Sequence, residues 1–107
     1  MKNIYELDCR FDKRKSFYGK AKVLEQDGSI LLFSYGTCVC VLYDDNVYLN
    51  QYSYNESQTT MRHIKEFLKQ YKEIFMETKE IHKNFNNKTF LSFYDIPKEK
   101  TMEILGV

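Results

Sequence analysis

The stretch from Ser34 to Gln70 constrains the fold more strongly than any other part of the chain. Its sequence is SYGTCVCVLYDDNVYLNQYSYNESQTTMRHIKEFLKQ. In chain order, it contains an apolar strand pattern, a tight-turn signal, an aromatic-rich strand pattern, a polar helix cap and an amphipathic helix pattern. β-branched and aromatic residues favour strands, whereas Asp and Asn favour turns. Because almost no residues separate these segments, the stretch predicts a compact ββα unit.

Two strands are predicted before this unit. Apolar and polar side chains alternate over residues 3–11, which is the period of a half-buried strand. A second strand is expected from Phe17 to about Glu25. Asp27-Gly28 then predicts a hairpin, because a primed turn needs positive φ and glycine adopts it without steric cost.

The next two strands continue an antiparallel meander. Residues 29–43 are expected to form one long strand, interrupted by a bulge or bend at Gly36. The central part of this strand is apolar on both faces, which indicates the middle of the sheet. A turn follows at residues 44–46, and residues 47–54 are expected to form the fourth strand.

The main helix is expected to begin after Ser57 or Thr59, either of which can cap its first turn at a gain of about 1 kcal/mol. Apolar side chains recur every three or four residues and form one face, which consists of Met61, Ile64, Phe67, Leu68, Tyr71, Ile74 and Phe75. The opposite face is polar and consists of Arg62, Lys65, Glu66, Lys69 and Lys72. We expect a break near Thr78, which would cap a second short helix ending near Phe85.

The remaining residues predict a final strand over 88–94 and a short helix that starts around Asp95–Pro97 and ends before Gly106. Because no linker or repeat divides the chain, residues 1–107 are expected to form a single domain. The predicted fold class is α+β, with an antiparallel β-meander of four to five strands packed against one main amphipathic helix and a short C-terminal helical segment.

The charge balance excludes two classes of partner recognition. With 16 Lys and Arg against 15 Asp and Glu, the net charge is +1, so the chain is neither a strongly acidic mimic of DNA nor a globally basic nucleic-acid binder. One local cluster remains. Between Arg10 and Lys22 the only acid is Asp12, and the basic residues are Arg10, Lys13, Arg14, Lys15, Lys20 and Lys22.

Cysteine usage and hydropathy indicate the compartment. Cys9, Cys38 and Cys40 make an odd count, and Cys38 and Cys40 are expected to share one strand face, which is poor geometry for a mutual disulfide. Such a pattern favours a reducing compartment. The N-terminus lacks the apolar core of a signal peptide, and no run approaches the roughly 20 apolar residues of a membrane span. We therefore expect a cytoplasmic protein of a bacterial host cell with no membrane partner.

Catalytic and metal chemistry lack a recognisable pattern. Cys38 and Cys40 are too close together, and His63 and His82 too far apart, for the usual zinc-ligand spacings. Asp44 and the residue after it are explained by their turn. The expected protein is not an enzyme, and it has no catalytic residue, no metal and no cofactor.

Two groups of residues remain as candidates for binding. Tyrosine is favoured in protein interfaces because it buries a large area at low entropic cost, and Tyr52 and Tyr54 lie just before the main helix. The basic cluster from Arg10 to Lys22 includes aromatic side chains, a mixture that suits nucleic-acid phosphates and bases.

The segments SFYGKAKV, SYGTCVCV and VYLNQYSYNESQTTMRHIKEFLKQ occur in an order that resembles a family of small proteins from phages, plasmids and integrated elements of low-GC Gram-positive bacteria. The resemblance covers residues 16–70. It implies an accessory gene of a mobile element, a setting in which short proteins often bind a host protein, as anti-CRISPR proteins do. Within its TT-x-RHI segment, Arg62 and His63 are expected to face outward as partner-binding residues.

We therefore expect a non-enzymatic binding protein of a mobile genetic element, such as an anti-CRISPR-like inhibitor of a bacterial defence nuclease that acts by protein–protein contact. The expected partner is a host defence protein such as a CRISPR effector, and the candidate contact residues are Tyr52, Tyr54, Arg62 and His63. The alternative is a small nucleic-acid-binding or regulatory protein that uses the basic hairpin between Arg10 and Lys22. The binding face and the oligomeric state stay open.

Overall fold

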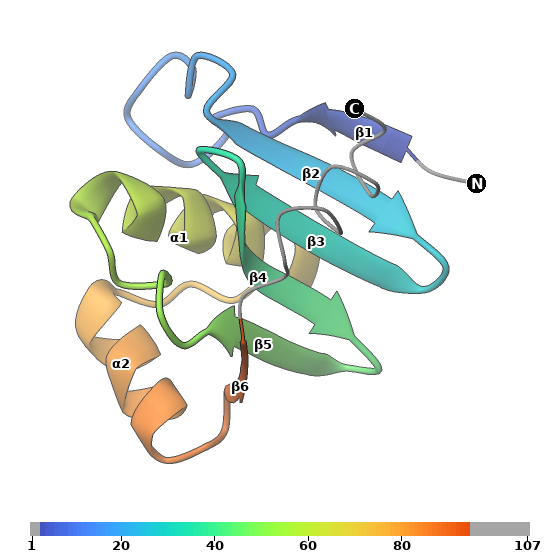
Figure 1. The fold of residues 1–107 in the computed structure, drawn as a ribbon. Coiled ribbons are helices and arrows are strands. Elements are labelled where there is room, and N and C mark those ends of the chain that lie inside the picture. Colours follow the sequence, from blue (N-terminus) through green and yellow to red (C-terminus); the bar gives the residue numbers. More distant parts are fainter. Residues whose placement is uncertain (1–2, 95–107) are drawn as a thin grey trace.

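The computed structural model describes residues 3–94, which form one six-stranded sheet and two helices (Figure 1). In chain order the elements are β1 (Asn3–Glu6), β2 (Ala21–Gln26), β3 (Ser29–Ser34), β4 (Thr37–Tyr43), β5 (Asn46–Asn50), α1 (Gln58–Lys72), α2 (Thr78–Asn86) and β6 (Leu91–Phe93). The strands lie in sequence order across the sheet, β1 to β5 as an antiparallel meander. This confirms the predicted α+β fold with one main helix on the sheet. The helix predicted from Asp95 lies outside the described residues.

Three two-residue turns connect β2 to β5, and both residues of each turn have positive φ, as primed hairpins require. The turns are Asp27-Gly28, Tyr35-Gly36 and Asp44-Asp45. The first and third are where the sequence predicts them. The second divides the predicted long strand 29–43 into β3 and β4, so that prediction is wrong. Tyrosine is a poor first residue for such a turn, which is why the local sequence does not reveal it.

A β-bulge lies in β4 at Val39 instead of Gly36. Leu32 pairs with Cys40 while Phe33 pairs with Cys38, so Val39 is the extra residue between them. The bulge sends the two cysteines to opposite faces of the sheet, Cys40 into the main core and Cys38 into a second cluster. The expectation that they share one face is therefore wrong.

Four predicted strands are shorter than expected. β1 ends at Glu6, although the alternation of residues 3–11 predicts a strand over that whole range. β2 starts at Ala21 and not at Phe17, because Tyr18 and the glycine after it turn the chain with positive φ. β5 ends at Asn50, whose side-chain oxygen accepts the backbone N–H groups of the second and third residues after it. The predicted final strand contracts to β6, which runs parallel to β5.

Helix α1 begins as expected and ends at a break. Ser57 is its N-cap, and the Ser57 hydroxyl accepts the backbone N–H of Thr60 at 3.1 Å. The helix stops where Glu73 adopts a left-handed conformation, which confirms a break before the second helix. The cap of α2 is Glu77 and not Thr78, because the Glu77 side chain completes a capping box with Glu80.

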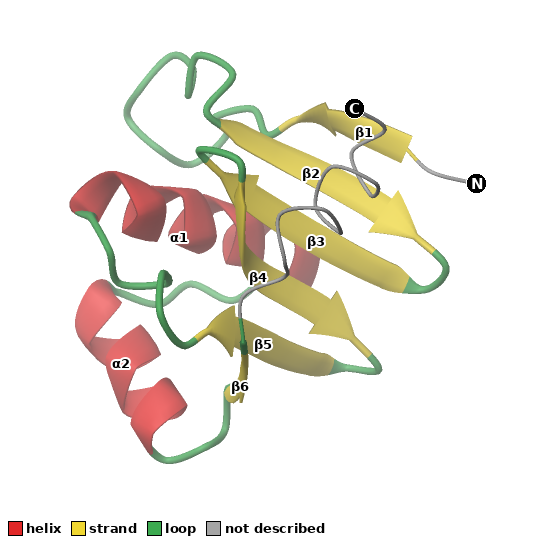
Figure 2. Cartoon of the chain, viewed as in Figure 1, coloured by secondary structure: helices red, strands yellow, loops and turns green. Residues whose placement is uncertain are grey.

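The main core lies between the sheet and the two helices, which Figure 2 shows on the same side of the strands. The apolar face of α1 supplies Met61, Ile64, Phe67 and Leu68, and α2 supplies Ile81. The sheet contributes the side chains that alternate toward α1, among them Val23, Leu32, Cys40, Leu42 and Leu49.

Candidate binding surface

The four side chains expected to bind a partner divide into two exposed and two buried ones. Tyr52 is exposed, and Arg62 is half exposed on the outer side of α1. Tyr54 packs in the core, and its hydroxyl is 2.8 Å from Nδ1 of His82. His63 is fully buried, which corrects the expectation that it faces outward. The reason is helical geometry, because the sheet-facing side of α1 at its first turns includes Thr60 and His63.

His63 lies in a closed aromatic and polar environment. Its Nδ1 is 2.8 Å from the Ser34 hydroxyl, and its ring contacts that of Phe17 edge-on at 4.5 Å between centroids. Its Nε2 is buried and has no hydrogen-bond partner among residues 3–94. Burial lowers the pKa of His63 to about 4, so the ring is neutral at physiological pH. His63 is therefore an interior residue and not a surface contact.

Exposed tyrosines gather at one end of the sheet. Tyr18 precedes β2, Tyr35 follows β3 and Tyr52 follows β5, and in an antiparallel meander these three positions share an end. Their exposed fractions are 74%, 57% and 62%. Tyr94, after β6, extends the group, since its ring lies 6.0 Å from that of Tyr52. We call the surface formed by Tyr18, Tyr35, Tyr52 and Tyr94 the tyrosine end.

Two members of the tyrosine end have the same unusual backbone. Tyr18 and Tyr35 have φ values of 53° and 52°, and each is followed by a glycine that also has positive φ. The two turns are joined directly, because the backbone N–H of Tyr35 donates to the carbonyl of Lys20 at 2.8 Å. A bulky side chain in the left-handed region is rare and costs on the order of 1 kcal/mol. The fold therefore presents both rings outward at a cost in stability.

The predicted basic hairpin is the loop between β1 and β2 together with the start of β2, where Lys22 lies, and all six of its predicted cations are exposed. Arg10 forms an ion pair with Asp8 at 3.3 Å. The other five have no acidic partner within 4.0 Å in the described part of the chain, and they are Lys13, Arg14, Lys15, Lys20 and Lys22. In sequence, these cations lie within five residues of Tyr18 of the tyrosine end.

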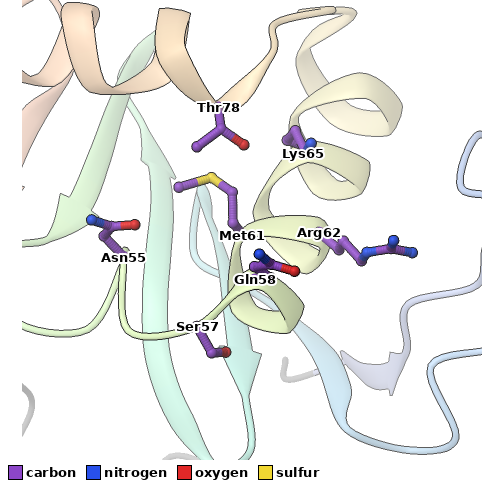
Figure 3. A pocket seen from close by; sticks show the side chains of 7 residues that line it. All are labelled: Asn55, Ser57, Gln58, Met61, Arg62, Lys65 and Thr78. Atoms are coloured by element: carbon purple, nitrogen blue, oxygen red, sulfur yellow. The ribbon is translucent and has the colours of Figure 1, made fainter.

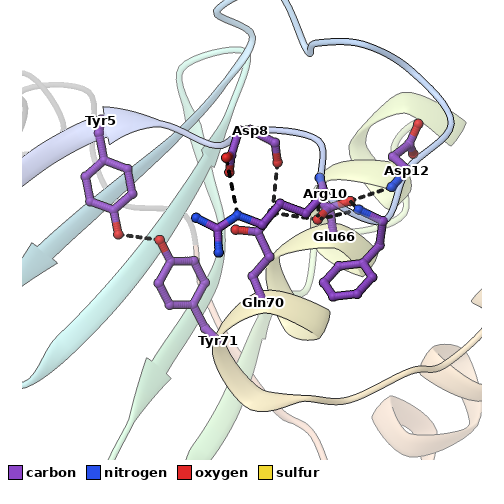
Figure 4. Close-up of polar contacts among 8 residues, drawn as sticks. Tyr5, Asp8, Arg10, Asp12, Glu66, Gln70 and Tyr71 are labelled. Atoms are coloured by element: carbon purple, nitrogen blue, oxygen red, sulfur yellow. Dashed lines mark hydrogen bonds and ion pairs between the residues drawn. The ribbon is translucent and has the colours of Figure 1, made fainter.

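A buried carboxylate attaches this loop to the main helix (Figure 4). Glu66 is 1% exposed, although the sequence predicts it on the solvent-facing side of α1. Its carboxylate accepts the backbone N–H groups of Arg10, Phe11 and Asp12, the last at 2.7 Å. Gln70 donates to the same carboxylate. The loop that covers Glu66 comes from a distant part of the chain, so the helix pattern alone gives no signal of this burial.

The outer face of α1 borders two shallow hollows. One, of about 310 Å³, separates the first turns of α1 and α2 (Figure 3) and is lined by Asn55, Ser57, Gln58, Met61, Arg62, Lys65 and Thr78. The other, of about 390 Å³, adjoins the basic loop and is lined by Phe11, Asp12, Lys13, Arg62, Lys65, Glu66, Lys69 and Glu77.

Most cations on this helix face have acidic partners. Arg62 lies 3.6 Å from Asp12, and Lys65 lies 3.8 Å from Glu77. Lys72 lies 3.7 Å from an aspartate of the β4–β5 turn. The loop cations are therefore more available to a ligand than the helix cations are.

The thiol of Cys40, the possible metal ligands and the length of the helices each bear on what the described residues can do. Burial raises the pKa of Cys40 well above its usual value, so that thiol stays protonated. Among residues 3–94, no three His, Cys, Asp or Glu side chains gather in a way that could hold a metal ion. No helix in that range is long and apolar enough to span a membrane.

Comparison with known protein families gives one result. Residues 5–92 match the model of a family of unknown function, DUF8033, and the match includes all the elements from β2 to α2 together with the basic loop. No curated protein matches the chain, and no solved structure matches it.

Proposed function

The chain belongs to DUF8033, a family of unknown function, and we propose that it is a non-enzymatic binding protein that contacts another protein through the tyrosine end. Tyrosine is over-represented among the residues that contribute most to protein–protein affinity. Tyr52, one of the predicted contact residues, belongs to this surface. His63 supports this surface from the core, where its ring lies 5.9 Å from that of Tyr35, whereas Tyr54 belongs to the core.

The observation that carries this proposal is the shared geometry of Tyr18 and Tyr35. At a left-handed position Asn, Asp or Gly would be less strained than Tyr. Both rings stay mostly exposed, although the ring of Tyr35 also lies 5.9 Å from that of His63. Strained backbone at exposed side chains is typical of functional surfaces. Two such residues side by side favour a binding role for this end of the sheet.

The resemblance to mobile-element proteins supplies the proposed setting. In that setting the protein acts in the cytoplasm of a bacterial host and inhibits a defence nuclease, such as a CRISPR effector, by protein–protein contact. The near-neutral net charge of +1 supports recognition through a shaped surface and not through imitation of DNA.

Affinity capture tests this proposal. The tagged protein is incubated with a bacterial lysate that contains an active CRISPR system, treated with nuclease, and the bound proteins are identified by mass spectrometry. We expect one stoichiometric defence protein that survives nuclease treatment. Its capture should be lost in the double variant Tyr18→Ser/Tyr35→Ser.

The matched control is Tyr43→Ser, which removes a ring that is 52% exposed at the opposite end of β4. This variant should capture the partner as well as the unaltered protein does. Capture that is insensitive to the tyrosine end, or that disappears with nuclease, would contradict the proposal.

A second candidate function, nucleic-acid binding, is favoured by five cations that have no acidic partner among the described residues and lie within five residues of Tyr18 in the sequence. A single strand could place phosphates on the cations and stack a base on the tyrosine. Fluorescence anisotropy with a labelled single-stranded oligonucleotide tests it at low and moderate salt. We expect affinity that falls steeply with salt and is lost in the triple variant Lys13→Gln/Arg14→Gln/Lys15→Gln.

The control for that experiment makes the same charge change on another surface. Lys79, Lys83 and Lys88 are exposed on and just after α2, away from the loop. Replacing all three by Gln should leave binding nearly unchanged. Equal losses in the two triple variants would indicate attraction to net charge alone and would count against a nucleic-acid site on the loop.

A further inference from the structure

The two hollows on the outer face of α1 meet at Arg62 and Lys65, which line both of them. Together they form one surface, which we call the helix groove. Gln58 lines the groove at the end near α2, and Lys69 lines it at the end near the basic loop. The residues from Gln58 to Lys69 extend about 16 Å along the helix axis. The helix groove is therefore long enough for about five residues of an extended peptide.

The end of the helix groove near the basic loop is rich in cations. Lys13 and Lys69 line it together with the two shared cations, Arg62 and Lys65. The acids at this end are already engaged, by Arg62, by Lys65 or by backbone N–H groups of the loop. Lys13 and Lys69 have no acidic partner within 4.0 Å in the part of the chain that the structure describes. This end therefore has two cations available for an anionic ligand.

The end of the helix groove near α2 is polar and uncharged (Figure 3). Asn55 and Gln58 are exposed there, and the side-chain amide of neither makes a hydrogen bond within residues 3–94. A side-chain amide both donates and accepts hydrogen bonds, as the backbone of a peptide does. The phosphate groups of a nucleic acid only accept them. A peptide backbone therefore suits this end better than a phosphate backbone does.

We propose that the helix groove binds a short acidic segment of another protein in an extended conformation. Lys65 and Lys69 are four residues apart on α1, which is about 6 Å along the helix axis. Alternate side chains of an extended chain lie on one side, about 6.6 Å apart. Carboxylates at alternate positions of the segment therefore reach both cations, while its backbone reaches the amides of Asn55 and Gln58. The helix groove shares no residue with the tyrosine end, so this inference stands apart from the proposed function.

An NMR titration of the full chain, labelled with ¹⁵N, tests the inference. The probe is a capped peptide in which three Asp residues alternate with three Ser residues, at low salt. We expect saturable shifts of the backbone amides from Gln58 to Lys69 and of the side-chain amides of Asn55 and Gln58, with a Kd of about 1 mM or lower. The same peptide with Asn in place of Asp should cause no saturable shift, because it cannot pair with the cations.

Two kinds of variant separate a specific groove from attraction to net charge. Lys65→Gln/Lys69→Gln should raise the Kd about tenfold, whereas Lys79→Gln/Lys83→Gln makes the same charge change at exposed positions of α2 and should leave the Kd nearly unchanged. Asn55→Ala leaves the charge unaltered and should raise the Kd about threefold. The amide spectrum of each variant shows whether it is folded.

Three results would overturn the inference. The first is the absence of saturable shifts with the Asp–Ser peptide. The second is an equal effect of the two double variants, which would indicate attraction to net charge alone. The third is a thymidine tetranucleotide that shifts the same amides with an equal or lower Kd, because it has the same net charge as the peptide but a backbone of phosphates.

Discussion

The carboxylate of Glu66 lies 2.7 Å from the backbone nitrogen of Asp12, and this contact joins the middle of α1 to the basic loop. The same carboxylate also accepts hydrogen bonds from the backbone N–H groups of Arg10 and Phe11 and from the side-chain amide of Gln70. We predict that Glu66→Gln destabilises the domain by about 1–3 kcal/mol, because an amide NH₂ would face backbone N–H groups where an oxygen accepts them now. Urea unfolding followed by circular dichroism measures the change.

Two measurements accompany that variant. Glu56→Gln makes the same substitution at an exposed loop position and should change the stability by less than about 0.5 kcal/mol. Amide hydrogen exchange at residues 10–12 should accelerate in Glu66→Gln and not in Glu56→Gln. If the loop amides exchange at the same rate in both variants, Glu66 does not hold the loop in place.

The burial of His63 predicts a specific acid sensitivity. Its pKa is lowered to about 4 in the folded state against 6.5 in an unfolded chain, mainly by burial. The unfolded chain therefore binds the proton first as pH falls below 6.5, and stability is lost progressively between about pH 6.5 and pH 4. At about pH 4.5 the expected loss from this group is on the order of 2–3 kcal/mol.

Variants at the two histidines of the chain isolate this effect. Gln cannot titrate, so His63→Gln should lower stability at neutral pH but lose less of it on acidification than the unaltered protein does. His82→Gln retains the buried ring and should keep the full acid dependence. Urea unfolding at several pH values gives both slopes, and parallel slopes for all three proteins would exclude His63 as their cause.

The parts of the fold that the sequence predicts are those that depend on local signals. Asp27-Gly28 specifies its own turn, and the Ser57 cap with the apolar stripe after it specifies α1. The turn at Tyr35-Gly36 and the bulge at Val39 have no such signal, because the pairing of whole strands determines them.

In the candidate site, too, local sequence predicts some features, whereas others depend on distant parts of the chain. Exposure of the basic loop follows from its charge, whereas the burial of Glu66 depends on a loop 54 residues away that supplies its donors. The inward position of His63 depends on where α1 crosses the end of β3, at Ser34. Periodicity predicts which residues share a helix face but not how wide a strip of that face the rest of the protein covers.

Ser57 and Thr59 are two caps that the sequence alone cannot distinguish, and the structure assigns the role to Ser57. We predict that Ser57→Ala costs about 1 kcal/mol, because the backbone N–H of Thr60 loses its acceptor. Thr59→Ala removes a hydroxyl inside the first turn and should change stability by less than about 0.5 kcal/mol. Thermal unfolding of the two variants gives the comparison, and equal shifts would show that the cap is shared.

The strained backbone of Tyr18 predicts a variant that gains stability and loses function. Asn adopts the left-handed region at lower cost than Tyr, and the Tyr18 ring is mostly exposed, so Tyr18→Asn should stabilise the domain by about 0.5–1 kcal/mol. Tyr43→Asn, at a strand position whose ring is also more than half exposed, should bring no gain. Urea unfolding compares the two, and partner capture with Tyr18→Asn should weaken. If Tyr18→Asn proves less stable than the unaltered protein, Tyr18 contributes to packing at this turn, and the strain no longer supports a binding role.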